Sequence, residues 1–251
     1  MKKFLNLILF LNCLILSDLE AKISTIHSIR DVIKYLSPKT SRIVVFDIDN
    51  TLLRAPTDLG SDQWVSFIVK QKVAEGMSHS DAWNQILPTY FHIQRHINLV
   101  PTEPDIVDSV GEIEQMCDHT ICLTARCPIH LTTITCAQLI KNNLKFQVPE
   151  VNHTQLTLPG DSIYQDGVLF CGHSCKGEVL VNFLRACRYM PKEIILIDDK
   201  LYNLEAVEKQ LANHGIQFTG LRYAGCDALI LSLDMVKAKQ DLDELLLQYP
   251  L

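Results

Sequence analysis

The sequence lacks internal repeats, low-complexity tracts and an excess of positive charge. Its 23 Lys and Arg residues are outnumbered by 29 Asp and Glu residues, which gives a formal net charge of −6. A net acidic surface disfavours nonspecific binding to nucleic acid, because that binding depends on cations that neutralise backbone phosphates. Apolar residues make up 47% of the chain and charged residues 21%, a balance typical of proteins that bury a core. With 251 residues, the chain is expected to form one domain with an embedded insertion.

The sequence also lacks an apolar run long enough for a comfortable membrane span, which needs about 20 residues. The run at residues 4–16 is short and is interrupted by Asn6 and Asn12. Two lysines precede it, and a short stretch ending in Ala21 follows it. Because this order of charged, apolar and small residues is typical of a secretory signal, we predict that residues 1–21 are a signal peptide and that cleavage leaves no stable membrane span. An uncleaved anchor is the alternative.

Of the nine cysteines, Cys13 lies in the predicted leader and the other eight lie in the rest of the chain. An even number of cysteines in an exported protein permits disulfide bonds. Cys122, Cys171 and Cys187 occupy apolar positions of predicted strands or helices, where a reduced cysteine packs as a small hydrophobic side chain. We therefore expect some disulfide bonds but no disulfide scaffold.

Short apolar runs rich in β-branched residues alternate with helical patterns along most of the chain. An unbroken apolar run predicts a strand covered on both faces of a parallel sheet. Alternation of such strands with helices is typical of an α/β fold with a right-handed, doubly wound parallel sheet. The expected strands lie at residues 43–46, 120–123, 168–170, 194–197 and 216–223, and the expected helices at 131–143, 176–187 and 202–213. A leading helix over residues 24–36 and a closing helix, capped by Ser232 and running to Tyr249, complete the prediction.

One stretch, residues 57–104, interrupts this alternation. It separates the first two strands and carries helical patterns at residues 62–75 and 80–96. Ligands of open α/β sheets bind outside the carboxyl ends of the strands, so an insertion at this point would stand over the site. We therefore predict a core formed by residues 22–56 and 105–251, and a small helical cap formed by residues 57–104. The residues expected in the cap core, with one aromatic reaching the pocket, are Trp64, Phe67, Ile68, Trp83, Ile86 and Leu87.

Polar and reactive residues appear where the apolar runs stop. Asp47 and Asp49 follow the first run, and Thr124 and Arg126 follow the second. The later runs are followed by Lys176, Asp198 and Asp199. Because the carboxyl ends of parallel strands share one edge of the sheet, these residues should meet there. Four carboxylates in one place repel each other unless a cation offsets their charge, and an all-oxygen ligand set favours Mg²⁺ over zinc.

This arrangement resembles the haloacid dehalogenase (HAD) superfamily, whose motifs are Asp-x-Asp-x-Thr, a Ser or Thr after the second strand, a downstream Lys and a later acidic pair. All four occur here in order, at residues 47–51, 124, 176 and 198–199. More narrowly, the stretches at residues 123–126, 175–180 and 220–223 are similar to those of a group of exported bacterial HAD-like proteins with no assigned substrate. The resemblance implies a HAD-like Rossmannoid core. It also implies an exported protein of the bacterial envelope, either periplasmic or secreted.

The resemblance further implies a magnesium-dependent phosphomonoester hydrolase that acts on a small phosphorylated substrate. Asp47 would attack phosphorus and form an aspartyl-phosphate, which divides one difficult displacement into two easier ones. Asp49 would protonate the leaving oxygen and then activate water, a role that needs a carboxyl kept partly protonated by its surroundings. Thr124 and Lys176 would bind the phosphoryl oxygens.

Acidic residues would hold the metal, and several neighbours would support the site. The metal ligands that the resemblance implies are the Asp47 carboxylate, the Asp49 backbone carbonyl, Asp198 and, through water, Asp199. The supporting or substrate-contacting residues are Asn50, Thr51, Arg126 and Asn203. Of these, Asn203 is expected to steady the acidic loop.

Several of these residues also have simpler interpretations. An Asp, Asn or Thr after a strand often caps the next helix, although four such turns at compatible strand ends argue against capping alone. Arg126 could bind a structural carboxylate instead of substrate, and Lys200, the rival of Lys176, is expected to face solvent. His92 and His96 stand four apart on a predicted helix, but no third ligand lies near them in the sequence.

The alternative function is a catalytically idle HAD-like protein that binds a phosphorylated ligand or a protein partner. The intact set of site residues argues against it, because a binding module has no need of both leading aspartates. No nucleic-acid partner is expected. The sequence leaves the substrate and the oligomeric state open.

Overall fold

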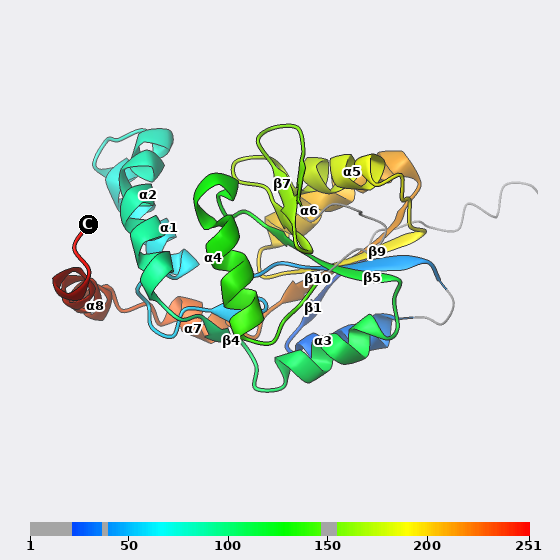
Figure 1. The fold of residues 1–251 in the computed structure, drawn as a ribbon, viewed down its shortest axis with the longest axis horizontal. Coiled ribbons are helices and arrows are strands. Elements are labelled where there is room, and N and C mark those ends of the chain that lie inside the picture. Colours follow the sequence, from blue (N-terminus) through cyan, green and yellow to red (C-terminus); the bar gives the residue numbers. More distant parts are fainter. Residues whose placement is uncertain (1–21, 37–39, 147–154) are drawn as a thin grey trace, which may run out of the picture.

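The computed structural model describes residues 22–36, 40–146 and 155–251. The predicted leader, residues 1–21, lies outside these ranges. The described chain forms a central β-sheet with helices on both faces and a separate group of helices at one end of the molecule (Figure 1). None of the helices in the described ranges combines the length and the apolar character needed to cross a membrane.

Within the described residues, the central sheet has eight strands, and the first six in spatial order run parallel. These six are β1 (Lys22–Ile26), β10 (Gln217–Tyr223), β9 (Glu193–Asp198), β2 (Arg42–Phe46), β5 (His119–Thr124) and β8 (Val168–Phe170). An antiparallel hairpin, formed by β7 (Ile163–Gln165) and β6 (Gln155–Thr157), extends the sheet beyond β8. The predicted α/β fold with a doubly wound parallel sheet is therefore confirmed, and the hairpin is an addition that the sequence did not indicate.

Each face of the sheet is buried by its own layer of helices (Figure 1). Successive residues of a strand point to opposite faces, so along β2 Val44 and Phe46 join one apolar cluster while Ile43 and Val45 join the other. Helices α5 (Lys176–Ala186) and α6 (Leu201–Leu211) cover the face of Ile43 and Val45. The opposite face is covered by the 3-10 helix η1 (Ile29–Tyr35), α3 (Ile106–Glu114) and α4 (Pro128–Lys141).

The predicted leading helix over residues 24–36 is wrong in its first half. Residues 22–26 form the edge strand β1, which pairs with β10 from Lys22 opposite Thr219 to Ile26 opposite Tyr223. The helical pattern is real only from Ser28 onward, where a capping box begins η1. Five residues gain more backbone hydrogen bonds by extending the sheet than by adding one turn to a short helix.

Helices α1 (Asp62–Ala74) and α2 (His79–His96) occupy the stretch predicted to form the cap. They are flanked by two short strands, β3 (Leu53–Arg54) and β4 (Val100–Pro101), which pair with each other antiparallel. The chain therefore leaves and re-enters the core at one place. Both helices begin at a serine, since the hydroxyls of Ser61 and Ser78 accept hydrogen bonds from backbone N–H groups of the first turn.

The closing helix α8 (Met235–Gln248) packs against α1 and α2 (Figure 1). It begins at Asp234 and not at the predicted Ser232, because the Asp234 carboxylate accepts hydrogen bonds from the backbone N–H groups of Val236 and Lys237. Its fully buried Ala238 joins an apolar cluster that includes Trp64. The same cluster contains most of the residues expected in the cap core, whereas the expected member Phe67 is exposed. The remaining helical elements are η2 (Ala212–His214) and α7 (Asp227–Leu231).

Candidate active site

Side chains from four strand ends meet at the carboxyl edge of the sheet. Asp47 follows β2, Thr124 ends β5, Lys176 opens the helix after β8, and Asp198 ends β9. All four are buried. The structure thus brings together the residues that the sequence predicts at this edge, because the strands that carry them are neighbours and run in the same direction.

Lys176 bridges two of the carboxylates. Its Nζ donates hydrogen bonds to Asp47 Oδ1 at 2.6 Å and to Asp198 Oδ2 at 2.7 Å. Burial alone would lower the pKa of Lys176, but the two carboxylates outweigh burial and leave the pKa above its ordinary value. The charged ammonium group of Lys176 therefore stabilises the carboxylates of two buried aspartates.

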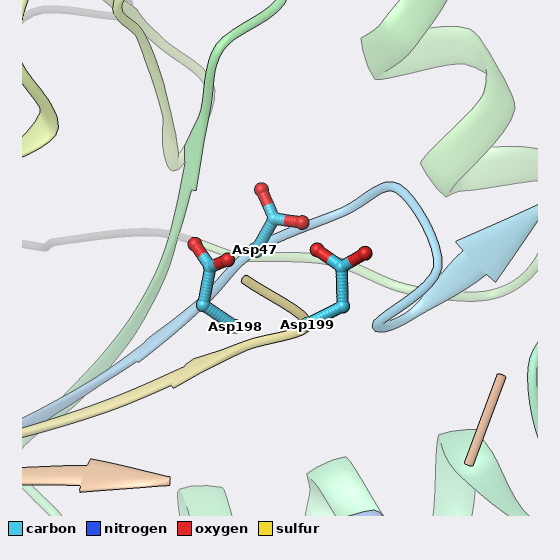
Figure 2. Close-up of side chains that lie close together, drawn as sticks. All are labelled: Asp47, Asp198 and Asp199. Atoms are coloured by element: carbon cyan, nitrogen blue, oxygen red, sulfur yellow. The ribbon is translucent and has the colours of Figure 1, made fainter. Parts of the chain in front are cut away.

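Asp199 adds a third carboxylate to this group. Figure 2 shows Asp47 at the end of one strand and Asp198 and Asp199 at the end of its neighbour, with the three carboxylates close together. Their ligand oxygens lie within 4.8 Å of one another. Burial, together with the charges of nearby carboxylates, raises the pKa of Asp47 to about 7 and that of Asp199 to about 8, although lysines oppose both shifts.

The donor set of this acidic cluster fits Mg²⁺. It is made of buried carboxylate oxygens, which are the ligands that Mg²⁺ prefers in proteins. Among the described residues, no side chain donates a hydrogen bond to the Asp199 carboxylate, so its oxygens are available to an ion that displaces its proton. Asp47, Asp198 and Asp199 are therefore the carboxylates that would hold the ion, and the Asp49 backbone carbonyl is the further ligand that the resemblance implies.

Asp49, the second acid of the leading motif, is held by Arg126. The guanidinium Nε donates to Asp49 Oδ2 and Nη2 donates to Asp49 Oδ1, both at 2.8 Å. Burial would raise the pKa of Asp49, but the charge and hydrogen bonds of Arg126 outweigh burial and bring the pKa below its ordinary value. The expectation of a partly protonated Asp49 is therefore wrong for this arrangement. Of the two readings of Arg126, the structure shows the one in which it binds a carboxylate of the protein.

A chain of buried hydrogen bonds links Arg126 to the cap. Arg126 Nη1 donates to Gln138 Oε1 at 2.7 Å, and Gln138 Nε2 donates to the backbone carbonyl of Gln94 at 3.2 Å. Gln94 Nε2 in turn donates to the carbonyl of Gly60 at 2.7 Å, near the start of the cap. Neither glutamine was predicted. The available signal was a polar residue on an otherwise apolar helix face, since Gln138 lies seven residues after the buried Leu131.

Asn203 steadies the acidic loop, as predicted. Its Nδ2 donates to both oxygens of Asp198, at 2.9 and 3.0 Å. The backbone N–H of Lys200 donates to Asp198 Oδ1 at 2.8 Å. With Lys176 on Oδ2, both oxygens of Asp198 have partners on the protein, which fixes the direction of this carboxylate.

The remaining predicted residues shape the loop after β2. Asn50 has a backbone φ of 58°, a left-handed conformation that asparagine tolerates better than most residues, and its Nδ2 donates to Gln63 Oε1 at 3.2 Å. The hydroxyl of Thr51 points back to Asp47 Oδ2 at 3.4 Å. The buried Thr124 hydroxyl accepts a hydrogen bond from the backbone N–H of Arg126 at 3.2 Å. Asn50 and Thr51 thus support the loop that presents Asp47.

Lys200 does not face solvent, so that prediction is wrong. Its Nζ lies 2.6 Å from Asp62 Oδ2, and both side chains are less than one third exposed. Burial would lower the pKa of Lys200, but the Asp62 and Asp199 carboxylates outweigh it and raise the pKa. Because Asp62 is the first residue of α1, this pair joins the acidic loop directly to the cap. A sequence gives no sign of this pair, since its members lie far apart along the chain.

The eight cysteines of the described residues are all free, so the expected disulfide bonds are not present there. Several are enclosed in the apolar clusters, where they pack as small hydrophobic side chains. Burial raises the pKa of Cys171 to about 12 and that of Cys226 to about 11, which keeps both thiols protonated at neutral pH.

His92 and His96, near the end of α2, hold the C-terminal segment. His92 Nε2 lies 2.8 Å from the backbone carbonyl of Tyr249, and the His96 ring stacks on the Tyr249 ring with centroids 4.1 Å apart. Within the described ranges, only the three aspartates form a cluster suited to a metal ion. The structure therefore supports a packing role for His92 and His96.

A cavity of about 480 Å³ opens between the cap and the core. The core contributes Asp49, Arg126 and Lys200 to its walls, and the cap contributes aromatic and aliphatic side chains of α1 and α2. Asp47, Asp198 and Asp199 are not among the lining residues, so the cavity adjoins the acidic cluster and Asp49 lies at the boundary between them.

The chain is similar to proteins of chlamydiae. It is 27% identical over 203 residues to a protein of Chlamydia pneumoniae named "Putative outer membrane protein", covering 81% of this chain and 76% of the relative. A protein of Chlamydia trachomatis with the same name is 27% identical over 201 residues, covering 80% of this chain and 75% of the relative.

Two solved structures with similar folds are both described as HAD-like. One is a haloacid dehalogenase-like hydrolase from Streptococcus pneumoniae, with a TM-score of 0.41 and 14% identity, covering 76% of this chain and 98% of that one. The other is the HAD domain of the effector protein Lem4 from Legionella pneumophila, an inactive mutant, with a TM-score of 0.40 and 12% identity, covering 81% of this chain and 100% of that one. A family model described as "Protein of unknown function (DUF2608)" matches residues 22–249, so the chain belongs to the DUF2608 family.

Proposed function

We propose that this protein is a magnesium-dependent phosphomonoester hydrolase of the HAD type. The observation that supports this most directly is the buried cluster of Asp47, Asp198 and Asp199 around the Lys176 ammonium group. A merely structural cluster would not need three acids at one strand edge with two of their pKa values raised by burial. When bound, Mg²⁺ would supply positive charge that offsets the oxygens of the phosphoryl group and of the aspartates.

In the first step, an Asp47 oxygen forms a bond to phosphorus while the bond between phosphorus and the leaving oxygen breaks. Lys176 and the Thr124 hydroxyl donate hydrogen bonds to the phosphoryl oxygens and stabilise their negative charge. Asp49 gives a proton to the leaving oxygen, so the product alcohol departs neutral. Because Arg126 favours the charged form of Asp49, the incoming phosphoryl group must accept hydrogen bonds that Arg126 otherwise donates to Asp49, so that Asp49 can carry the proton.

In the second step, Asp49 acts as a base, a role that suits the arrangement in the structure. It takes a proton from water, the water oxygen bonds to phosphorus, and the bond between phosphorus and Asp47 breaks. Phosphate leaves and Asp47 is restored. The low pKa that Arg126 imposes on Asp49 keeps this carboxylate ionised and ready for the proton.

The same ion pair favours a second candidate, a catalytically idle protein that binds a phosphorylated ligand. If Arg126 never released Asp49, the first step would lack its acid. The two candidates differ in turnover, which makes them experimentally separable. In either case we propose that the protein acts outside the cytoplasm, which the predicted leader and the names of the chlamydial relatives support.

The test is hydrolysis of p-nitrophenyl phosphate by the purified protein with Mg²⁺ or with a chelator. We expect turnover with Mg²⁺, a loss of at least about 100-fold with chelator, and a similar loss in Asp47→Asn. Asp108→Asn, which changes an exposed acid on α3, is the matched control and should retain activity. Turnover that survives both chelation and Asp47→Asn would overturn the mechanism, and no turnover with tight phosphate binding would favour the idle protein.

A further inference from the structure

Helix α2 presents one apolar face to the interior of the cap and a second one to the cavity. Ala82, Ile86 and Ile93 join the cluster shared with α1 and α8. The other face carries Trp83, Leu87, Tyr90 and Phe91, which lie at helical spacing and line the cavity, and Trp83 and Tyr90 also pack against the edge of that cluster. Three of these four side chains are aromatic. These four side chains form an aromatic and aliphatic stripe along the wall of the cavity on the cap side.

The charged groups of the cavity are balanced in pairs. Arg126 is bound to Asp49, and Lys200 is bound to Asp62. Asp161 is an exposed acid, and His173 is the only histidine among the described lining residues. A second phosphate or a carboxylate on a ligand would therefore find no uncommitted lysine or arginine in the described walls of the cavity.

We propose that this cavity binds the leaving group, and that the substrate is a phosphomonoester of an uncharged, planar, aromatic alcohol. This inference rests on the proposed hydrolase function. Asp49 and Arg126, which line the cavity, place its end beside the acidic cluster that would hold the phosphoryl group. Flat rings can stack on the stripe of α2 and bury apolar area there, with no charged group to be desolvated.

The cavity also argues against other common leaving groups. Its volume of about 480 Å³ is within the range of roughly 300–1,000 Å³ found for small-molecule sites, and is ample for one or two fused rings. A sugar or another polyol needs many hydrogen-bonding side chains. The cap side of the cavity offers the hydroxyls of Ser66 and Tyr90, the indole N–H of Trp83 and the carboxylate of Asp62, which Lys200 already binds. An extended polar leaving group would leave its own hydroxyls without partners.

The test compares 2-naphthylmethyl phosphate with ethyl phosphate, since both release an alkoxide of similar basicity and differ in the aromatic group. We expect kcat/KM to be at least about ten-fold higher for the naphthylmethyl ester. Trp83→Ala and Leu87→Ala should each lose most of this preference, measured as the ratio of the two kcat/KM values within the same variant. Phe67→Ala, which removes an exposed aromatic of the same cap outside the cavity, should keep the preference.

Equal kcat/KM values for the two esters, or equal losses on both in Trp83→Ala, would overturn the inference while leaving the hydrolase function intact. If p-nitrophenyl phosphate is not hydrolysed either, the proposed function fails. Whenever neither ester is hydrolysed, the cavity is tested by calorimetry with 2-naphthylmethanol. Binding to the native protein that is weakened at least about ten-fold in Trp83→Ala supports an aromatic site. No binding to the native protein overturns it.

Discussion

The guanidinium group of Arg126 binds both carboxylate oxygens of Asp49, Nε to Oδ2 and Nη2 to Oδ1, each at 2.8 Å. Its remaining nitrogen is held by Thr135 and Gln138, so Arg126 cannot turn away without losing several buried hydrogen bonds. The pair sets the protonation of the residue proposed as acid and base, and it links that residue to the cap. Its consequences for stability can be measured without knowing the substrate.

Arg126→Met should lower the free energy of unfolding by about 3 kcal/mol near neutral pH, because Asp49 is left without its cation. Since the folded-state pKa of Asp49 is lowered, this contribution is present above its unfolded pKa and is lost as pH falls through the folded value. The difference between native protein and variant should therefore shrink by about pH 3. Urea unfolding at both pH values measures it, and Asp49→Asn in each background completes a double-mutant cycle. A difference independent of pH would contradict the role given to the ion pair.

Lys176→Met should abolish hydrolysis and also destabilise the metal-free protein by about 3 kcal/mol, because it leaves two buried carboxylates without their shared cation. Mg²⁺ should then raise the melting temperature of the variant more than that of the native protein, since the ion replaces the missing charge. Lys34→Met, at an exposed lysine, is the control and should change neither property. Equal responses of Lys176→Met and native protein to Mg²⁺ would show that the ion binds elsewhere.

The raised pKa of Asp199 predicts that the stability of the metal-free protein falls as pH rises through the neutral range. Burial and the charge of Asp47 raise the pKa of Asp199 to about 8, above its unfolded value, so its contribution is favourable below the unfolded pKa and is lost as pH rises toward the folded one. In chelator, Asp199→Asn should therefore gain stability relative to the native protein between about pH 5 and pH 8, by at least about 1 kcal/mol. Thermal melting across this range measures the gain. Mg²⁺ should reverse the order at the upper pH, and an unchanged order would argue against Asp199 as a ligand.

Because the described cysteines are free, we expect that reductant does not change the stability of the protein. All eight described cysteines are free, and burial raises the pKa of several of their thiols. Thiol titration of the chain without residues 1–21 should count eight after denaturation and fewer before it, with Cys171 among the protected ones. Adding dithiothreitol should leave the melting temperature unchanged. A count below eight in the denatured protein would reveal disulfide bonds.

The core and the position of the acidic cluster were predictable because both depend on local patterns. An unbroken apolar run such as residues 43–46 identifies a buried strand, and parallel strands carry the residues after them, such as Asp47 and Asp198, to one edge. The partners of individual side chains were not predictable. Lys200 was expected in solvent and instead pairs with Asp62, which lies far away in the sequence.

The features that local patterns could not predict depend on contacts with other parts of the chain. The polar strand β1 is fixed by β10, from the other end of the described chain. Helix α8 has the amphipathic pattern expected of it, but a pattern does not say which surface it covers, and it packs on α1 and α2. The hairpin β6–β7 is too short and too polar to stand out from a loop.

The central claim is that Asp47 becomes phosphorylated during turnover, and acid quenching tests it most directly. The purified protein is mixed with p-nitrophenyl phosphate and Mg²⁺, quenched in acid within the first turnover, and analysed by peptide mass spectrometry. The account predicts a phosphoryl group on the peptide that contains Asp47, more of it in Asp49→Asn, whose second step is slowed, and none in Asp47→Asn. Turnover with an unmodified Asp47, or a phosphoryl group on any other residue, would contradict it.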